Sequence, residues 1–204
     1  DETTSPSIEE RVKFASENGA SLLVSIHLNS AGTTNETTTT ANGVEAMVAK
    51  IGTYNPANAV AGQNLATTIL KELINLGFND RGLVVKEGDG NYTDGSKSDY
   101  FGIVRYGQQL NVPSIIVEHG FLNNESDFKN YLSTETGLKK LGEADAKGIA
   151  KYLGLDLKEG WNTDSNGNRY YVKDGAKLKG WQVLDGKTYY FDPEGRTLTG
   201  TPEI

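Results

Sequence analysis

The sequence predicts an α/β protein with a layered sheet flanked by helices, followed by a small β-hairpin solenoid. Between residues 7 and 153, stretches with helical spacing alternate with short apolar runs, a pattern typical of layered α/β domains. Seven aromatic residues, including both tryptophans, gather after residue 154. Motifs in this last region recur at an offset of 19 or 20 residues, which indicates a repeat array.

The elements of the first region follow from periodicity and capping signals. Ser7 and Glu10 fit a capping box, which predicts a helix that ends near Glu17. The other predicted elements are strands at 22–26, 44–49, 83–85, 100–105 and 114–117, helices at 57–76, 126–132 and 137–153, and polar loops at 31–42 and 86–97.

The last region reads as two short hairpins. In each unit a strand with Trp precedes a polar turn, and an aromatic strand follows it. Gly160-Trp161 recurs as Gly180-Trp181, and Tyr170-Tyr171 recurs as Tyr189-Tyr190. We therefore expect two domains, residues 1–154 and residues 155–204.

Charge and composition exclude several classes of protein. Lys and Arg number 20 against 27 Asp and Glu, so the net charge is −7 and a nucleic-acid partner is not expected. No apolar run approaches the roughly 18 residues of a membrane-spanning helix. The absence of cysteine excludes disulfides and Cys-ligated zinc, and imidazole chemistry must use His27 or His119.

His27 is the first candidate for chemistry. It ends the apolar run that begins at Leu22, and ligands of α/β sheets bind at the carboxyl ends of strands. The alternative is that His27 only closes its strand with a hydrogen bond.

Glu118 is the second candidate. It follows the apolar run 114–117, so burial should raise the pKa of its carboxyl and suit it to proton transfer. The alternative is a carboxylate paired with a helix N-terminus or an arginine. On an extended strand the neighbouring His119 points the opposite way, and we interpret it as structural.

Two weaker candidates lie nearby. Arg81 and Arg105 stand near predicted strand ends, where they could clamp an anionic substrate or pair with Glu118. The Gly/Asp-rich stretch 86–97 loosely matches a calcium loop but lacks the closing Glu, so a solvated loop is the favoured interpretation.

Together these segments resemble the zinc-dependent N-acetylmuramoyl-L-alanine amidases, which carry a Ser-Ile-His-x-Asn motif and a later Val-Glu-x-Gly-Phe motif. The matching stretches are 8–20, 25–29, 79–83 and 112–124. The resemblance implies that His27 is a zinc ligand and Glu118 the catalytic carboxylate, with Asn29, Arg81 and Arg105 as substrate-binding candidates. It further implies cleavage of peptidoglycan at the amide between N-acetylmuramic acid and L-alanine of the stem peptide.

The sequence also departs from this family. Family members carry two earlier zinc ligands, a His in an Asp-x-Gly-His-Gly pattern and a Glu, and neither motif is present here. We therefore expect a fragment that lacks the first strand and helix of the family fold, binds zinc weakly and is inactive. A catalytic zinc site needs about three protein ligands.

The tail resembles choline-binding-type cell-wall repeats. The residues that carry this resemblance are Trp161, Tyr170, Tyr171, Trp181, Tyr189 and Tyr190. Aromatic rings attract quaternary ammonium groups, so the resemblance implies binding to choline or teichoic acid on the wall. The alternative is that these rings form only the core of the solenoid.

The leading interpretation is therefore a secreted, wall-associated hydrolase of the autolysin type. One alternative is a non-enzymatic wall-binding protein that keeps a degenerate amidase scaffold. Another is a calcium-stabilised adhesin module, which rests only on the stretch 86–97 and the repeats.

Overall fold

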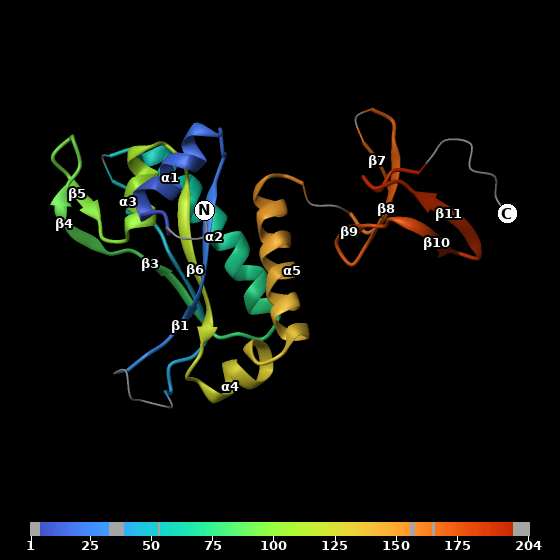
Figure 1. Cartoon of the computed structure of the whole chain (residues 1–204), viewed down its shortest axis with the longest axis horizontal. Coiled ribbons are helices and arrows are strands. Elements are labelled where there is room, and N and C mark those ends of the chain that lie inside the picture. The colour runs from blue at the N-terminus through green and yellow to red at the C-terminus, as the bar shows by residue number, and fades with distance from the viewer. Residues whose placement is uncertain (1–4, 33–38, 53, 156–157, 165, 198–204) are drawn as a thin grey trace. The chain divides into compact units, whose positions relative to one another are not determined.

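The computed structural model describes residues 5–32, 39–52, 54–155, 158–164 and 166–197 of the 204-residue chain. The chain divides into two compact units, Asp1–Tyr152 and Leu153–Ile204, here called the front unit and the tail unit. Figure 1 shows helices and a sheet in the front unit and short hairpins in the tail unit. The predicted fold class is confirmed in both units.

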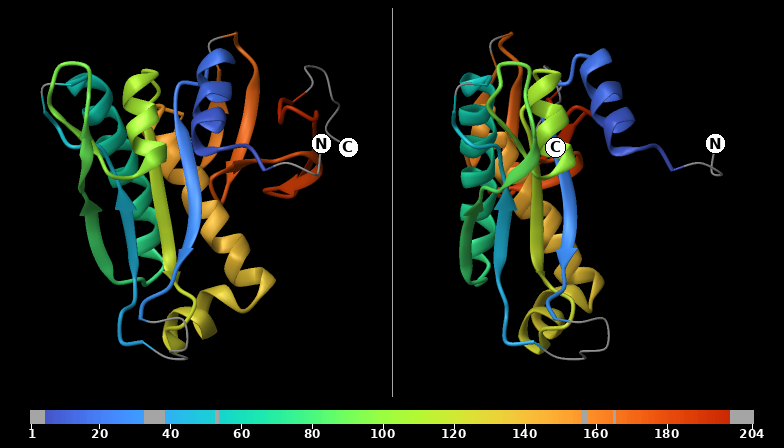
Figure 2. Two further views of the ribbon diagram at one scale, coloured as in Figure 1. Left: turned by 60° about the vertical axis from the view of Figure 1, so that its left-hand side comes forward. Right: turned by 90° about the vertical axis from the view of Figure 1, so that its left-hand side faces the viewer.

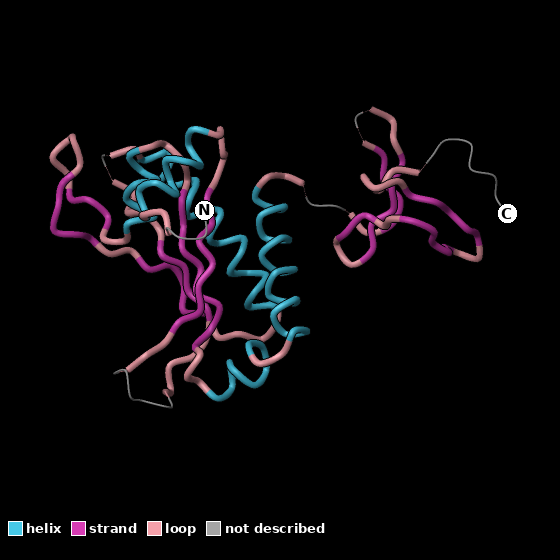
Figure 3. Tube along the Cα trace, in the orientation of Figure 1, coloured by secondary structure: helices cyan, strands magenta, loops and turns pink. Residues whose placement is uncertain are grey.

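A four-stranded mixed sheet forms the centre of the front unit. Its order is β1 (Leu23–Asn29), β6 (Ser114–Phe121), β2 (Val44–Met47) and β3 (Asp80–Val84). Strand β1 runs parallel to β6, β2 runs antiparallel to β6, and β3 runs parallel to β2. Figure 3 shows these strands side by side in the middle of the unit. Strands β1 and β6 therefore end at the same edge of the sheet.

The helices of the front unit begin and end close to the predicted positions, with one addition. They are α1 (Ile8–Glu17), α2 (Pro56–Asn75), α3 (Gly102–Gln109), α4 (Glu125–Asp127), the π-helical turn η1 (Phe128–Leu132) and α5 (Glu135–Tyr152). The predicted capping box is confirmed at the start of α1. The Ser7 amide donates to the Glu10 carboxylate at 2.7 Å, and the Glu10 amide donates to the Ser7 hydroxyl.

One face of the sheet is covered by α2 and α5 (Figure 2). Residues of α2 such as Leu65 and Ile69 are fully buried against strand residues such as Val44 and Val117. Gly148 lets the two helices approach, because a Cβ at this position would lie 2.5 Å from the Ile69 Cα. Side chains alternate between the faces of a strand, so every second residue of these strands lies on the opposite face.

Two predictions for the front unit are wrong. The sequence predicts a strand at Tyr100–Arg105, but helix α3 begins at Gly102 within this segment. It also predicts a loop at 86–97, but this stretch forms β4 (Glu87–Asn91) and the start of β5 (Lys97–Asp99), which pair as a hairpin.

The tail unit consists of hairpins, as predicted. Its strands are β7 (Gly160–Thr163), β8 (Arg169–Lys173), β9 (Ala176–Lys177), β10 (Gly180–Leu184) and β11 (Lys187–Phe191). Positive φ angles of 50° at Asp185 and 76° at Gly186 turn β10 into β11, as two-residue hairpins require. Val172 and Phe191 are fully buried.

Among the residues that the structure describes, no helix has the length and apolarity needed to cross a bilayer.

Candidate functional site

The strand register brings two predicted residues together and adds a third. His27 of β1 pairs with Glu118 of β6, which in turn pairs with Glu45 of β2. Glu45 and Glu118 lie on the sheet face opposite α2 and α5, because Val44 and Val117, the residues before them, face that core. His27 shares this face, because Val24, three positions earlier on the same strand, packs against the core. The candidate site is therefore a row of three titratable residues across three strands.

Glu45 was not predicted from the sequence as a residue of the site. It is 9% exposed, and its two carboxylate oxygens accept from the Asn29 amide and the Arg81 Nε, each at 2.8 Å. Arg81 also lies over the ring of Phe121, 5.0 Å from the centroid. Asn29 and Arg81 thus join the site through Glu45, and Arg81 does not pair with Glu118. A carboxylate in the otherwise apolar run of β2 was the signal that could have revealed Glu45.

Glu118 has the environment of a proton-transfer group. Its Oε2 atom is buried and has no hydrogen-bond partner among the described residues. Burial is the main cause that raises the pKa of Glu118; the Glu45 charge raises it further, whereas His27 and His119 lower it. A carboxyl with a raised pKa is suited to accept and donate a proton during a reaction.

His27 is exposed, and its Nε2 lies 2.9 Å from the Ser25 hydroxyl. The described residues contain no group of three or more His, Cys, Asp or Glu side chains that could hold a metal ion. Glu45 is committed to Asn29 and Arg81, as its two hydrogen bonds show. The residues present at this face therefore do not fit a three-ligand zinc site.

His119 points into the core, as predicted. It is 1% exposed, and its Nε2 lies 2.9 Å and 3.0 Å from the two carboxylate oxygens of Asp145 on α5. Its Nδ1 lies 3.2 Å from the main-chain oxygen of His27. Burial lowers the pKa of His119, but hydrogen bonding and the charge of Asp145 more than offset this and raise it. The protonated ring can donate to both acceptors, so His119 supports the backbone at His27 from behind.

Two predicted features lie apart from this row. Arg105 donates to the main-chain oxygens of Asp99 and Tyr100, at 3.1 Å and 3.0 Å, and so ties α3 to β5. The hairpin β4–β5 is held by a hydrogen bond of 2.6 Å from the Tyr92 hydroxyl to Asp99. Asp94 accepts from the amide and hydroxyl of Ser96. Two carboxylates of this hairpin, Asp94 and Asp99, thus bind groups of the protein itself.

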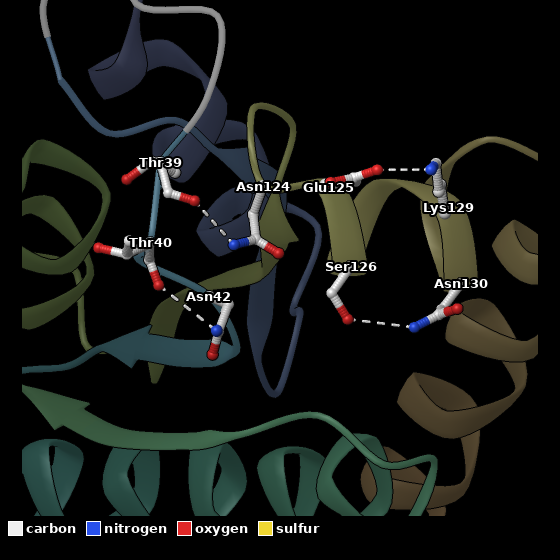
Figure 4. Close-up of a pocket in the computed structure, with 8 residues that line it drawn as sticks. All are labelled: Thr39, Thr40, Asn42, Asn124, Glu125, Ser126, Lys129 and Asn130. Atoms are coloured by element: carbon white, nitrogen blue, oxygen red, sulfur yellow. Dashed lines mark hydrogen bonds and ion pairs between the residues drawn. The ribbon is translucent and has the colours of Figure 1, made fainter.

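A cavity of about 660 Å³ lies where β6 has ended and the chain enters β2 (Figure 4). Its walls carry amides and hydroxyls together with one ion pair. They are formed by Thr39, Thr40, Asn42, Asn124, Glu125, Ser126, Lys129 and Asn130. The Asn124 amide donates to the Thr39 main-chain oxygen at 2.9 Å, and the Asn130 amide donates to the Ser126 hydroxyl at 3.2 Å. The cavity lies at the edge of the sheet where β1 and β6 end.

The aromatic residues of the tail divide into packed and exposed rings. Trp161 packs against Tyr171 and Tyr189, with ring centroids 5.3 Å and 4.9 Å apart. Trp181 lies 5.1 Å from Tyr190 and is 62% exposed.

Basic side chains lie over two further ring faces of the tail. The guanidinium of Arg169 is 4.5 Å from the Trp161 centroid, and the ammonium of Lys177 is 4.0 Å from the Tyr170 centroid. The rings predicted to bind a ligand therefore differ from one another in packing, in exposure and in whether a cation lies over them.

Comparison with known proteins agrees with this architecture. The family N-acetylmuramoyl-L-alanine amidase matches residues 1–151, and the choline-binding repeat matches residues 158–201. A Bacillus subtilis protein named Uncharacterized protein YqiI is 34% identical over 146 residues, which are 71% of this chain and 57% of that protein. The chain thus spans just over half the length of this curated relative.

Solved structures lead to the same family. Cwp6 from Clostridium difficile has a TM-score of 0.58 and 25% identity, and covers 74% of this chain and 20% of its own. An N-acetylmuramoyl-L-alanine amidase from Clostridium difficile has a TM-score of 0.55 and 27% identity, over 76% of this chain and 69% of its own. Since the family match extends over most of its length, this chain belongs to the N-acetylmuramoyl-L-alanine amidase family.

Proposed function

We propose that the front unit belongs to a peptidoglycan hydrolase that cleaves the amide between N-acetylmuramic acid and L-alanine, and that the tail unit binds the wall. The observation that carries the chemistry is the buried carboxylate oxygen of Glu118, which has no partner in the described part of this chain of the amidase family. The division into a catalytic domain of residues 1–154 and a wall-binding domain of residues 155–204 belongs to this proposal. So does a location at the wall, outside the cell.

Glu118 is the proposed catalytic residue. An amide is cleaved only when water loses a proton and the leaving nitrogen gains one, and a carboxyl with a raised pKa can carry that proton. Glu45 accepts hydrogen bonds from Asn29 and Arg81, and its charge beside Glu118 favours the protonated form of Glu118. Asn29 and Arg81 are thus proposed as residues that position Glu45.

Zinc is implied by the resemblance, with His27 as its ligand, but the described residues form no group that would hold it. We therefore assign no zinc-dependent step to them. We propose that this polypeptide alone binds zinc weakly and releases stem peptide at a rate near background.

Two measurements on the full chain test this proposal. Metal analysis after equilibration with zinc should give well below one zinc per chain, and release of stem peptide from purified sacculi should match the Glu118→Gln variant. Stoichiometric zinc, with peptide release that E118Q abolishes, would overturn the proposed inactivity and support Glu118 as the catalytic residue.

The second candidate is a non-enzymatic wall-binding protein with a degenerate amidase scaffold. The observation that favours it is the same lack of a metal-binding group among the described residues. Co-sedimentation with sacculi measures wall binding separately from peptide release. Wall binding without any peptide release, even with zinc in excess, supports this alternative. Failure to co-sediment would exclude wall binding from both candidate functions.

The polar cavity is the proposed place for the saccharide portion of the substrate. Its amides and hydroxyls can both donate and accept hydrogen bonds, as sugar hydroxyls require, and Lys129 is already paired with Glu125 at 2.5 Å. Its volume of about 660 Å³ suits a ligand larger than one sugar ring.

Calorimetric titration of the full chain with peptide-free glycan strands tests this placement. We expect Ser126→Ala with Asn130→Ala to weaken binding about tenfold, since two hydrogen-bonding groups are lost. Asn75→Ala, on helix α2 and outside the lining of the cavity, is the matched control and should bind as the parent does. Equal affinities for all three proteins would exclude the cavity as the glycan site.

A further inference from the structure

In the tail, the sheet of β7, β8 and β9 is here called the first hairpin, and the pair β10 and β11 the second hairpin. The first hairpin covers two of its aromatic rings with its own cations. Arg169 stands 4.5 Å from the centroid of Trp161, and Lys177 stands 4.0 Å from the centroid of Tyr170. Both distances are within the 6 Å or so over which a cation is attracted by the face of a ring. These are the ring faces that a quaternary ammonium ligand would need.

A tethered cation competes well with a free one. Arg169 and Trp161 lie on the paired strands β8 and β7, so the guanidinium is held near its ring at a high effective concentration. A ligand that displaces the guanidinium must still bind beside its positive charge, which repels a second cation. The same reasoning applies to Lys177, which is on β9 beside Tyr170 on β8.

The second hairpin differs at the corresponding positions. Arg169 directly precedes the pair Tyr170-Tyr171, and Thr188 holds the equivalent place before Tyr189-Tyr190. Trp181 pairs across the strands with Tyr190 and is 62% exposed, so much of its surface is open to solvent. The first hairpin thus presents rings that are covered by cations, and the second hairpin presents an accessible pair of rings.

We propose that Arg169 and Lys177 are specificity-determining residues that exclude quaternary ammonium groups from the first hairpin. Weak ammonium binding is then confined to Trp181 and Tyr190 of the second hairpin. The wall ligand of this tail is accordingly selected by a group other than choline. This inference rests on the proposed wall-binding function and narrows its ligand.

The two tryptophans of the chain, Trp161 and Trp181, allow each hairpin to be read separately. Trp161→Phe leaves Trp181 as the single reporter, and Trp181→Phe leaves Trp161. Titration of the full chain with choline chloride at constant ionic strength should change the emission of W161F only. In the W181F background, adding R169Q and K177Q should let Trp161 respond to choline. The response should need a choline concentration at least about fivefold lower than any that the W181F protein itself requires, because two competing contacts are lost.

Two further variants serve as controls. Lys173→Gln removes an exposed positive charge from the same strand β8 and should leave the W181F protein unresponsive. Arg169→Lys keeps the cation and should preserve exclusion, which a purely structural role of the arginine would not predict. Without choline, an emission maximum equal to that of the W181F protein confirms that the charge substitutions made in this background keep the fold.

The inference is overturned if Trp161 in the W181F protein responds to choline as strongly as Trp181 does in W161F. It is also overturned if R169Q with K177Q leaves the response unchanged. Co-sedimentation with sacculi is independent of both outcomes. Loss of sacculus binding with intact choline exclusion refutes the proposed wall-binding function but leaves Arg169 and Lys177 as residues that exclude quaternary ammonium groups.

Discussion

In the front unit, different residues stabilise the fold and form the candidate site, whereas in the tail unit the same rings have both roles. In the front unit, the aliphatic core and the His119–Asp145 pair lie on one face of the sheet, and Glu118 with Glu45 and His27 lies on the other. In the tail unit, the rings that pack the hairpins are also those predicted to meet the ligand. Substitutions can therefore separate the two roles in the front unit more readily than in the tail.

The two units also carry different spectroscopic probes. The described helices all belong to the front unit, and both tryptophans belong to the tail. Circular dichroism at helix wavelengths thus follows the front unit, and tryptophan emission follows the tail. When a substitution changes one unit, the signal of the other unit therefore serves as an internal control.

The largest effect is expected for Asp145→Ala. It leaves the buried ring of His119 without its carboxylate partner, and removing one partner of a buried pair of this kind costs about 3–5 kcal/mol. Urea unfolding followed by circular dichroism should show this loss, with tryptophan emission unchanged. Glu143→Ala removes an exposed carboxylate from the same helix and should cost less than about 0.5 kcal/mol.

Phe191→Ala should have the next largest effect, confined to the tail. Phe191 is fully buried, and loss of a buried Phe side chain costs about 3 kcal/mol or more. Tryptophan emission should report unfolding at lower urea, with the helical signal unchanged. Val183→Ala, at a position that is 71% exposed, is the matched control. A coupled loss of both signals would contradict the independence of the two units.

The pH dependence of the front unit should be smaller and should come from His119. Its pKa is raised in the folded state above the ordinary value of about 6.5, so the stabilisation is complete below that pH and is lost as pH rises through the raised value. The urea midpoint by circular dichroism should therefore fall as the pH rises above about 6.5. In Asp145→Asn this fall should be reduced, and an equal fall in both proteins would refute the assignment.

The smallest effect is a gain in stability for Glu118→Gln. The raised pKa means that ionised Glu118 disfavours the folded state above pH 4.5 or so. An uncharged amide removes this penalty, and we expect a gain of up to about 1 kcal/mol in the front unit at pH 7. Glu45→Gln is the contrasting variant and should destabilise, because it weakens the pairing with Arg81. A loss of stability in E118Q would show that its carboxylate is structural.

Apolar runs and local capping made much of the fold predictable from the sequence. The run before His27 and the run before Glu118 form neighbouring strands, and Ser7 and Glu10 form the predicted cap. These signals lie within a few residues of each other, so no tertiary information is needed to read them. The opposite orientations of Glu118 and His119 also follow from the alternation of a single strand.

Features that depend on distant partners escaped prediction. Within Tyr100–Arg105 the apolar residues resemble a strand, and the helical face of α3 becomes visible only when Gly107 and Gln108 are included. The stretch 86–97 pairs as a hairpin because Tyr92 reaches Asp99. Glu45 matters through Asn29 and Arg81, which no local pattern links to it.

The strand order of the front unit has a consequence for the speed of folding. Strand β1 begins at Leu23, yet its partner β6 begins at Ser114, and β2 pairs with β6 as well. Contacts between such distant segments require closure of a long loop, which slows folding, whereas the hairpins of the tail join neighbouring strands. The tail should therefore fold first when the whole chain is diluted from denaturant. During synthesis, however, the central sheet cannot close until β6 has emerged from the ribosome.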